Sequence, residues 1–283
     1  MKYRCPHCKS SFYSKQGHFF RKDDSKFIQR LKCKDCLSNY SYASFSSCYQ
    51  QKKRRINSYL AKFLCSGMSQ RRAALVLNIN LKTVARKLIF LAREARRNHA
   101  DFLKNLKVGE IQFDDLITSH HTKLKPLTLS LAVETSSRQI LGLELGEIPA
   151  FGHLAKISRK KYGKRKSEHK KCLNDLFQKL SPIIQKKSLI ESDEHKFYEE
   201  FVNKYAPDSN YYQYKSERAS VVGQGELKRV KRDPLFQINH TLAMLRANVN
   251  RLFRRTWNTT KDPKRLLDHL WLYVEFHNKV LVG

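Results

Sequence analysis

Two Cys-x-x-Cys pairs near the N-terminus constrain the fold of this 283-residue chain more than any other feature. Cys5 and Cys8 form the first pair, and Cys33 and Cys36 form the second. Two residues between thiolates let one tight turn present both sulfurs to a single ion, and two such turns complete a tetrahedral site. The aromatic-rich segment between the pairs is too small to hold a core without a metal. We therefore expect short strands packed over a bound Zn²⁺ ion.

His7 and Cys48 are alternative ligands for this site, and the alternative to zinc is a set of unrelated thiols. The first residues carry no apolar run of the secretory type, so we expect a cytoplasmic protein. Its seven Cys are then metal ligands or buried thiols rather than disulfides. No stretch approaches the ~20 apolar residues of a membrane-spanning helix, and we expect no membrane partner.

The excess of basic residues indicates the partner. Lys and Arg number 56 against 25 Asp and Glu, which gives a formal net charge of +31. Such a chain repels itself unless a polyanion is near, so nucleic acid is the expected partner. A hydrophobic content of 41% with repeated amphipathic segments indicates folded cores, which argues against a ribosomal-type protein.

Composition divides the chain into residues 1–50, 51–105 and 106–283. The first region is rich in Cys and aromatic residues, the second is basic with helical periodicity, and the third alternates strand-like and helix-like segments. We expect a multidomain α+β protein. Its parts would be an N-terminal zinc ribbon, a helix-turn-helix DNA-binding domain and a C-terminal ribonuclease-H-like mixed sheet flanked by helices.

The second region has the pattern of a helix-turn-helix. Ser69 is suited to cap a short helix that ends at Leu77, and residues 78–80 make the turn. A second, basic helix follows from Leu81 to about Arg97, and a helix of this kind can lie in a DNA major groove. The alternative is a plain helical hairpin with a solvated basic face. On the DNA-facing side of the second helix we expect Lys82, Arg86 and Lys87.

The third region begins with three strand-like segments, residues 107–115, 127–133 and 139–145. A helix over 171–180 and a buried strand over 187–194 follow. The first and the last of these strands end in acids, and a ribonuclease-H-like sheet would bring those acids side by side. Two hard oxygen ligands at close range suit Mg²⁺ or Mn²⁺, which drive phosphoryl transfer.

Three further segments of this region carry expectations. The densely basic residues 156–171 predict a loop that grips phosphates. His120 and His121 follow the first acidic strand, and we expect a surface turn there, although they could approach the acids. Residues 266–276 predict a final helix packed on the sheet.

Residues 111–116 (IQFDDL), 190–198 (IESDEHKFY) and 239–255 (NHTLAMLRANVNRLFRR) resemble the catalytic blocks of bacterial insertion-sequence transposases. The likeness covers nearly the whole chain, since such elements also carry an N-terminal zinc ribbon and a helix-turn-helix. The resemblance implies that Asp114 and Asp193 are the two catalytic aspartates and that they bind Mg²⁺ or Mn²⁺.

The third block departs from the family pattern, in which a Glu begins the helix and a Lys or Arg follows seven residues later. In this chain Arg246 takes the basic position and Asn239 stands where the Glu would be. An amide carbonyl can still ligate a metal, though without charge. The neighbouring His240, as ligand or proton carrier, and Glu226, by spacing alone, are the alternatives.

These features predict a DNA transposase of the bacterial cytoplasm and nucleoid. It would bind the terminal repeats of its element and a double-stranded target, act as a homo-oligomer on DNA, and cleave and join strands with two divalent metal ions. The alternatives are a non-catalytic DNA-binding regulator, an inactive transposase remnant and a ribosome-associated zinc protein. Strands that end in acids argue against a regulator and against a ribosomal role.

Overall fold

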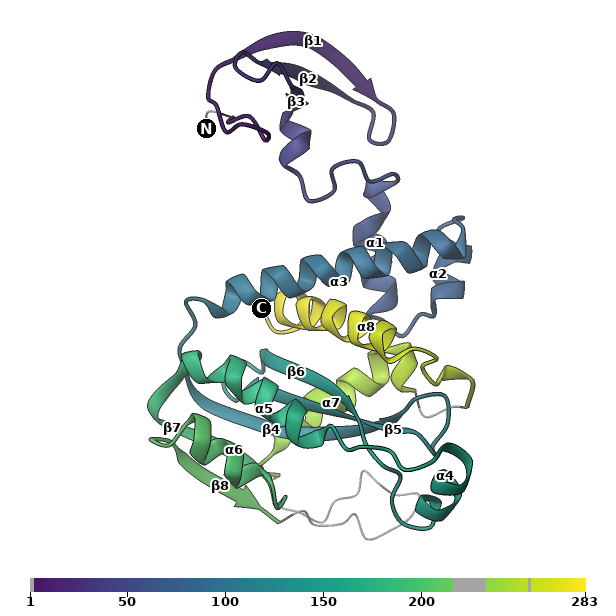
Figure 1. Cartoon of the computed structure of the whole chain (residues 1–283), viewed down its shortest axis with the longest axis vertical. Coiled ribbons are helices and arrows are strands. Elements are labelled where there is room, and N and C mark those ends of the chain that lie inside the picture. The colour runs from purple at the N-terminus through teal and green to yellow at the C-terminus, as the bar shows by residue number, and fades with distance from the viewer. Residues whose placement is uncertain (1–2, 216–232, 254–255) are drawn as a thin grey trace. The chain divides into compact units, whose positions relative to one another are not determined.

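A computed structural model of the chain describes residues 3–215, 233–253 and 256–283. The chain divides into two compact units, Met1–Leu60 and Ala61–Gly283, and each holds one β-sheet (Figure 1). The described residues contain eight α-helices, so the fold is mixed α and β. None of the described helices is both long and apolar enough to cross a membrane.

The first unit is a small antiparallel sheet of strands β1 (Tyr13–Arg21), β2 (Lys26–Cys33) and β3 (Asn39–Ser41). Two of the four paired cysteines belong to its core, which has few other buried apolar side chains. The buried members of this core are Cys5, Leu31, Cys33 and Tyr40, with Tyr13 packed against them. The hydrophobic effect alone provides little stability here, because the buried apolar area is small.

The second unit has a five-stranded sheet in the order β6-β5-β4-β7-β8 (Figure 1). Strands β4 (Val108–Ser119), β5 (Pro126–Glu134) and β6 (Ile140–Glu147) pair with one another in the antiparallel direction. Strands β7 (Ile184–Asp193) and β8 (Asn210–Tyr214) continue the sheet on the other side of β4 in the parallel direction. Strand β4, the first strand of this unit in the sequence, is therefore the central strand of the sheet.

Helices α5 (His169–Leu180) and α6 (Tyr198–Tyr205) cover one face of this sheet and build its main core. Gly142 of β6 lets α5 approach closely, because a Cβ there would lie 2.9 Å from the Leu176 side chain. The opposite face carries α7 (Phe236–Asn248), which contacts β4 and β5. Helix α8 (Pro263–Phe276) lies beside the edge strand β6 (Figure 1).

Helices α1 (Asn57–Leu64), α2 (Gln70–Val76) and α3 (Leu81–Leu103) occupy the segment for which a helix-turn-helix was predicted. Ser69 caps α2 as predicted, since its hydroxyl accepts a hydrogen bond from the Arg72 N–H at 3.3 Å. Asn80 caps α3 in the same way at 2.8 Å. The α3 helix runs past the predicted end at Arg97, because its C-terminal half packs on α8.

Polar contacts fix α3 and α1 to α8. The Arg96 and Arg265 guanidiniums bind the two oxygens of buried Asp268 at 2.7 and 2.6 Å. The fully buried His269 ring contacts the Leu64 carbonyl at 2.8 Å. The helices from residue 61 onward therefore belong to the same compact unit as the five-stranded sheet, whereas the three domains predicted from composition remain a prediction.

The structure differs from the sequence expectations at several elements. Strand β4 does not end at its acids but runs to Ser119, which pairs with Pro126 of β5. The basic segment 156–171, expected as a loop, contains most of α4 (Leu154–Tyr162) and the start of α5. Apolar Leu154 and Ile157 give α4 one hydrophobic side among its basic residues, which the charge of the segment concealed.

We expect Asp268→Ala to lower the free energy of unfolding by about 2 kcal/mol, because Arg96 loses its acid and Arg265 keeps only its 3.4 Å contact with Asp262. Both guanidiniums are partly exposed, which limits the loss. Urea unfolding followed by tryptophan fluorescence measures this, since both Trp residues lie in the second unit. Asp101→Ala, which removes an exposed pair with Lys104, is the matched control and should change stability by less than about 0.5 kcal/mol.

Candidate functional site

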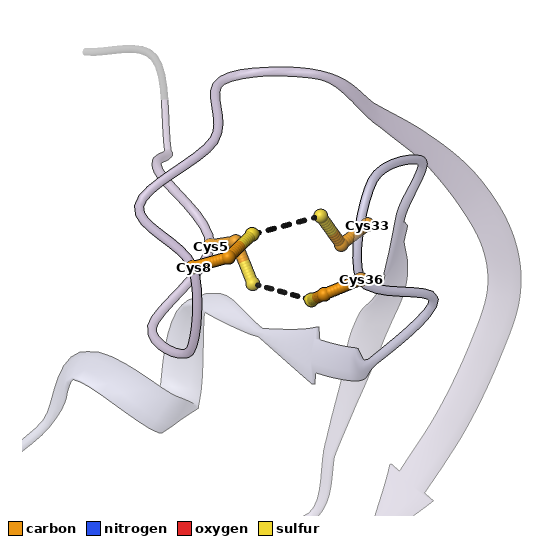
Figure 2. A group of neighbouring side chains, drawn as sticks. All are labelled: Cys5, Cys8, Cys33 and Cys36. Atoms are coloured by element: carbon orange, nitrogen blue, oxygen red, sulfur yellow. Dashed lines mark hydrogen bonds between the residues drawn. The ribbon is translucent and has the colours of Figure 1, made fainter.

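The four paired cysteines converge in the first unit. Their sulfur atoms all lie within 4.8 Å of one another, and Figure 2 shows them facing a common centre. Cys5 Sγ is 3.6 Å from Cys36 Sγ, and Cys8 Sγ is 3.5 Å from Cys33 Sγ. Zinc–sulfur bonds of about 2.3 Å in a tetrahedron separate sulfurs by about 3.8 Å. The predicted ligand set therefore fits one metal ion such as zinc.

The pKa values of two of the four thiols, Cys8 and Cys36, shift in opposite directions. Bonds from the side chain and backbone of Ser38 lower the pKa of Cys36 to about 6. A backbone hydrogen bond from Ser10 favours the Cys8 thiolate, but burial and the three neighbouring sulfurs outweigh it and raise the pKa of Cys8 to about 12. A divalent cation would displace the thiol protons that form hydrogen bonds between these sulfurs, because thiolates are the ligating form.

The alternative ligands do not join this cluster. His7 is exposed, and the Cys48 sulfur instead accepts a hydrogen bond from the Asn57 side chain at 3.6 Å. In the part of the chain that the structure describes, the four cysteines are the only group of three or more His, Cys, Asp or Glu side chains close enough to share one ion.

Asp114 and Asp193 meet on adjacent strands of the second unit. In the parallel pairing of β4 with β7, Phe113 lies opposite Ser192, so the following residue of each strand is an aspartate on the same face of the sheet. This is the face that carries α7. The sequence prediction that these two acids lie together agrees with the register of the strands.

Burial and mutual repulsion favour the protonated forms of these acids. Burial and the neighbouring Asp193 charge raise the pKa of Asp114 to about 7. Burial and the charge of Asp115 raise the pKa of Asp193. One oxygen of Asp193, Oδ1, is buried and has no hydrogen-bond partner among the described residues. An oxygen of this kind beside a second carboxylate is suited to ligate a cation.

A Mg²⁺ or Mn²⁺ ion fits the pair by the chemistry of its donors. Mg²⁺ commonly keeps several waters and binds one or two protein carboxylates together with substrate phosphates. Two carboxylates with an open side satisfy this requirement, but they do not form a closed protein cage. The pair therefore differs from the cysteine site, whose four ligands complete the coordination of an ion.

Two of the three candidates for a further ligand have other hydrogen-bond partners. The Asn239 amide nitrogen donates to Asp233 at 2.9 Å, and the His240 ring contacts the Arg138 guanidinium at 3.2 Å. Among the described residues neither forms a hydrogen bond with the acid pair, and Glu226 lies outside the described residues. Buried side chains of α7, Ile238, Thr241, Leu242 and Leu245, point toward the sheet, while Asn239 and His240 flank that row.

Arg246, seven residues after Asn239 on α7, acts electrostatically on the pair. Its positive charge lowers the pKa of Asp114, although burial and Asp193 outweigh this effect. Arg246 also lines a cavity that begins at the end of β4. The helix thus brings one cation to the acidic pair.

Asp115 points to the opposite face of β4 from Asp114, since side chains alternate along a strand. Its carboxylate accepts hydrogen bonds from Ser130, from Tyr198 at 2.7 Å, and from the His169 ring. Burial opposes the ionised form, but these three bonds outweigh it and hold the pKa of Asp115 below its usual range. Asp115 therefore fixes α5 and α6 to the central strand.

Gln112 and Glu191 fix α7 to the acid face, a role that sequence reasoning missed. The Gln112 amide donates to Glu191 and to the Pro234 carbonyl at 2.8 Å each, and accepts from the Ile238 N–H at 3.2 Å. Tyr214 donates to the second oxygen of Glu191 at 2.7 Å. The available signal was strand alternation, because Gln112 and Glu191 precede Asp114 and Asp193 by two positions and therefore lie on the same face of the sheet.

The predicted DNA-contacting residues of α3 fall into two groups. Lys82 and Arg86 are exposed, whereas Lys87 is 4% exposed and does not share their open side. Lys87 lies in the buried stripe of α3 between Val84 and Leu88, because positions three and four residues apart face the same side of a helix. Lys87 is therefore not on the exposed side that holds Lys82 and Arg86, and its contact with DNA stays a prediction.

His120 and His121 lie in the turn between β4 and β5, as expected, rather than against the acids. The His121 N–H donates to the Thr260 carbonyl at 2.8 Å, and the His120 N–H donates to Lys125 at the same distance. The turn is thus held against the segment that precedes α8.

Comparison with known proteins adds no assignment. The sequence matches no protein-family model, and no curated protein is significantly similar to it. The functional argument therefore depends on the geometry of the two candidate metal sites and on the motifs in the sequence.

We expect purified protein to contain one zinc ion per chain, and Cys33→Ser to lose it together with the ordered first unit. Structural zinc contributes roughly 10–16 kcal/mol of apparent binding free energy, so this small core should not persist without it. Elemental analysis and circular dichroism measure both effects. Cys48→Ser is the matched control and should keep its zinc; full zinc retention in a protein carrying both Cys33→Ser and Cys36→Ser would exclude the site.

We expect Asp114→Asn to stabilise the metal-free protein at pH 8 by up to roughly 4 kcal/mol. The unfolded chain ionises Asp114 near pH 4, whereas the folded protein keeps its proton up to about pH 7. The parent should therefore lose stability as pH rises between these values, and the variant should not. Added Mg²⁺ should stabilise the parent but not Asp114→Asn in thermal melts. Equal Mg²⁺ effects on both would contradict a metal site, with Asp101→Asn as the neutral control.

Proposed function

We propose that the protein is a DNA transposase of the insertion-sequence type, and that it cleaves and joins DNA strands at Asp114 and Asp193. The observation that carries this proposal is the parallel β4–β7 register, which puts both aspartates on one face under α7. Both acids have a raised pKa, and a pair of this kind has high affinity for a divalent cation.

The sheet supports the proposed ribonuclease-H-like fold. Three antiparallel strands are followed by a helix and then by a strand that returns, parallel, beside the first. This arrangement joins the two motif acids, which are far apart in the sequence. The third motif segment forms α7 on the acid face, where the resemblance to transposases requires it.

Each residue of the face has a chemical task in the proposed reaction. Bound Mg²⁺ or Mn²⁺ would activate the attacking oxygen and offset the charge that develops on the phosphodiester. Asp114 and Asp193 would hold the ions, and burial of these side chains would exclude competing water. Arg246, already close to Asp114, would bind a neighbouring DNA phosphate.

DNA recognition would belong to the zinc-binding unit and to α2–α3. Lys82 and Arg86 are exposed on the second helix of the helix-turn-helix. The net charge of +31 supplies the long-range attraction to DNA. The proposal includes assembly of several copies on the element ends, in the bacterial cytoplasm and at the nucleoid.

One observation favours a second candidate, an inactive transposase remnant. The side chains of Asn239 and His240 form hydrogen bonds with Asp233 and Arg138, respectively. No third carboxylate joins the acid pair among the described residues. A remnant would bind DNA through the same basic surfaces and would not cleave it.

We expect Asp114→Asn and Asp193→Asn each to reduce Mn²⁺-dependent cleavage of DNA carrying the element ends by about 10³-fold or more. Affinity for that DNA should be unchanged, because neither acid binds phosphate. Asn239→Ala should raise the metal concentration required for cleavage, and Asn239→Glu should retain activity if the position ligates a metal. Gel assays of cleavage and anisotropy assays of binding measure the two properties.

Two further variants decide the third position in the same assays. If Asn239→Ala cleaves like the parent while His240→Ala is inactive, histidine is the third residue. Glu226→Ala tests the remaining candidate. A parent protein that binds the ends with a normal salt dependence but never cleaves them would support the remnant instead.

A further inference from the structure

A large cavity opens at the far end of β4, beyond the acidic pair. It measures about 1010 Å³ and lies between the β4–β5 turn, α4 and the residues that follow α7. Ligand pockets begin at roughly 300 Å³, so this cavity can hold a group the size of a nucleotide. Arg246 belongs both to its lining and to the surroundings of Asp114. One cation is therefore shared by the cavity wall and the electrostatic environment of Asp114.

Much of the cavity wall is apolar and open to water. Ile117 of β4 and Ile157 of α4 are 41% and 53% exposed, and Leu154 lies next to them. A smaller adjoining hollow shares Ile117 and Leu154 and is also lined by Phe151, which is 66% exposed. Exposed apolar side chains gathered around one hollow indicate a ligand with an apolar face.

The remaining wall is basic. Lys123, Lys161 and Arg251 line the cavity together with Arg246. Arg251 is partly buried, and its only hydrogen bond to a described residue is a long one of 3.4 Å to the Thr260 hydroxyl. No acid of the described residues lies within 4.0 Å of its guanidinium. A poorly solvated cation without an acidic partner is stabilised when an anion binds beside it.

The combination identifies the class of ligand. A phosphate would satisfy the cations, but it offers nothing to the apolar wall. A paired base in a duplex keeps its faces stacked on its neighbours and cannot contact that wall. An unpaired nucleotide presents a bare base and a phosphate together, as in protein sites for single strands, which combine a basic groove with apolar or aromatic surfaces.

We propose that this cavity binds an unpaired nucleotide of the DNA strand next to the phosphodiester that is cleaved. The base lies against Ile117 and Ile157, and its phosphate lies between Lys161 and Arg251. The proposal rests on the proposed function for its choice of DNA as the polymer. It adds that the preferred substrate has its end unpaired, because the cavity stabilises a nucleotide outside the helix.

The test uses the full chain with its zinc and without added Mg²⁺ or Mn²⁺. Fluorescein-labelled 20-base-pair duplexes are compared by anisotropy, one fully paired and one with two mismatched base pairs at its end. We expect the parent to bind the mismatched duplex about ten-fold more tightly, as stacking of one base allows. The preference should fall to below two-fold in the double variant Ile117→Ala, Ile157→Ala.

Two matched controls separate the cavity from general effects. Val280→Ala removes an exposed apolar side chain outside the cavity and should keep the ten-fold preference. Lys161→Ala should weaken binding of the mismatched duplex more than that of the paired one, whereas Lys186→Ala should affect both alike. Circular dichroism and melting temperature confirm that each variant is folded.

Several outcomes would overturn the proposal. Equal affinity of the parent for both duplexes, or a preference that survives the double substitution, would exclude the nucleotide site. Tighter binding to an RNA of the same sequence would replace DNA by RNA. A parallel cleavage assay keeps the two proposals apart: a lost preference with intact metal-dependent cleavage contradicts only the cavity, and an intact preference without cleavage contradicts only the catalytic assignment.

Discussion

The pairing of β4 with β7 determines what this molecule can do, because it forces two buried carboxylates together. Phe113 lies opposite Ser192 in the parallel pairing, so Asp114 and Asp193 lie side by side on adjacent strands. Burial and the repulsion between them oppose ionisation, and both raise the pKa of Asp114. The surrounding contacts hold the register in spite of this repulsion. Gln112 binds Glu191 across the same two strands, and Asp115 fixes the central strand to α5 and α6.

The same face is connected to the helices proposed to bind DNA. Helix α7 is held at its start by the Ile238 N–H on Gln112. At its end, the Asn248 carbonyl accepts from the Gly67 N–H at 2.7 Å, and Asn250 donates to the Gly67 carbonyl at 3.2 Å. Gly67 has a φ of +77° and a Cβ there would lie 3.1 Å from Phe253, so this contact requires glycine. The turn before α2 and the acid face therefore share one rigid element.

The sequence allowed the metal-binding features to be predicted because they depend on short spacings. The Cys-x-x-Cys turns are local, and the Ser69 cap of α2 is local as well. Features that depend on tertiary packing could not be predicted in this way. Lys87 is buried because α3 continues as a packed helix, and α4 is a helix although most of its segment is basic. Helix α6 and edge strand β8 could not be predicted either, because they depend on contacts with a sheet whose strand order is not evident from the sequence.

The third predicted catalytic position, Asn239, shows the same limit of prediction from sequence at the candidate site. Asn239 precedes Arg246 by seven residues. Seven residues make about two turns of a helix, so the two side chains lie on the same side of α7. Spacing cannot state which side of α7 faces the sheet. The buried row of Ile238, Thr241, Leu242 and Leu245 determines that, and it leaves Asn239 and His240 at the margins, each with a partner of its own.

Charge explains why an acidic pair persists in a chain with a net charge of +31. Surrounding cations should lower the pKa of a carboxylate, and Arg246 does lower that of Asp114. Burial and the charge of Asp193 nevertheless have the larger effect on the pKa of Asp114. Interactions at short range inside low-dielectric protein are stronger than those with distant charges that water screens. The pair is thus partly protonated near neutral pH and gains most from a small divalent cation at short range. In the proposed function, the basic residues attract the DNA polyanion, and the two acids bind the divalent cation that accompanies it.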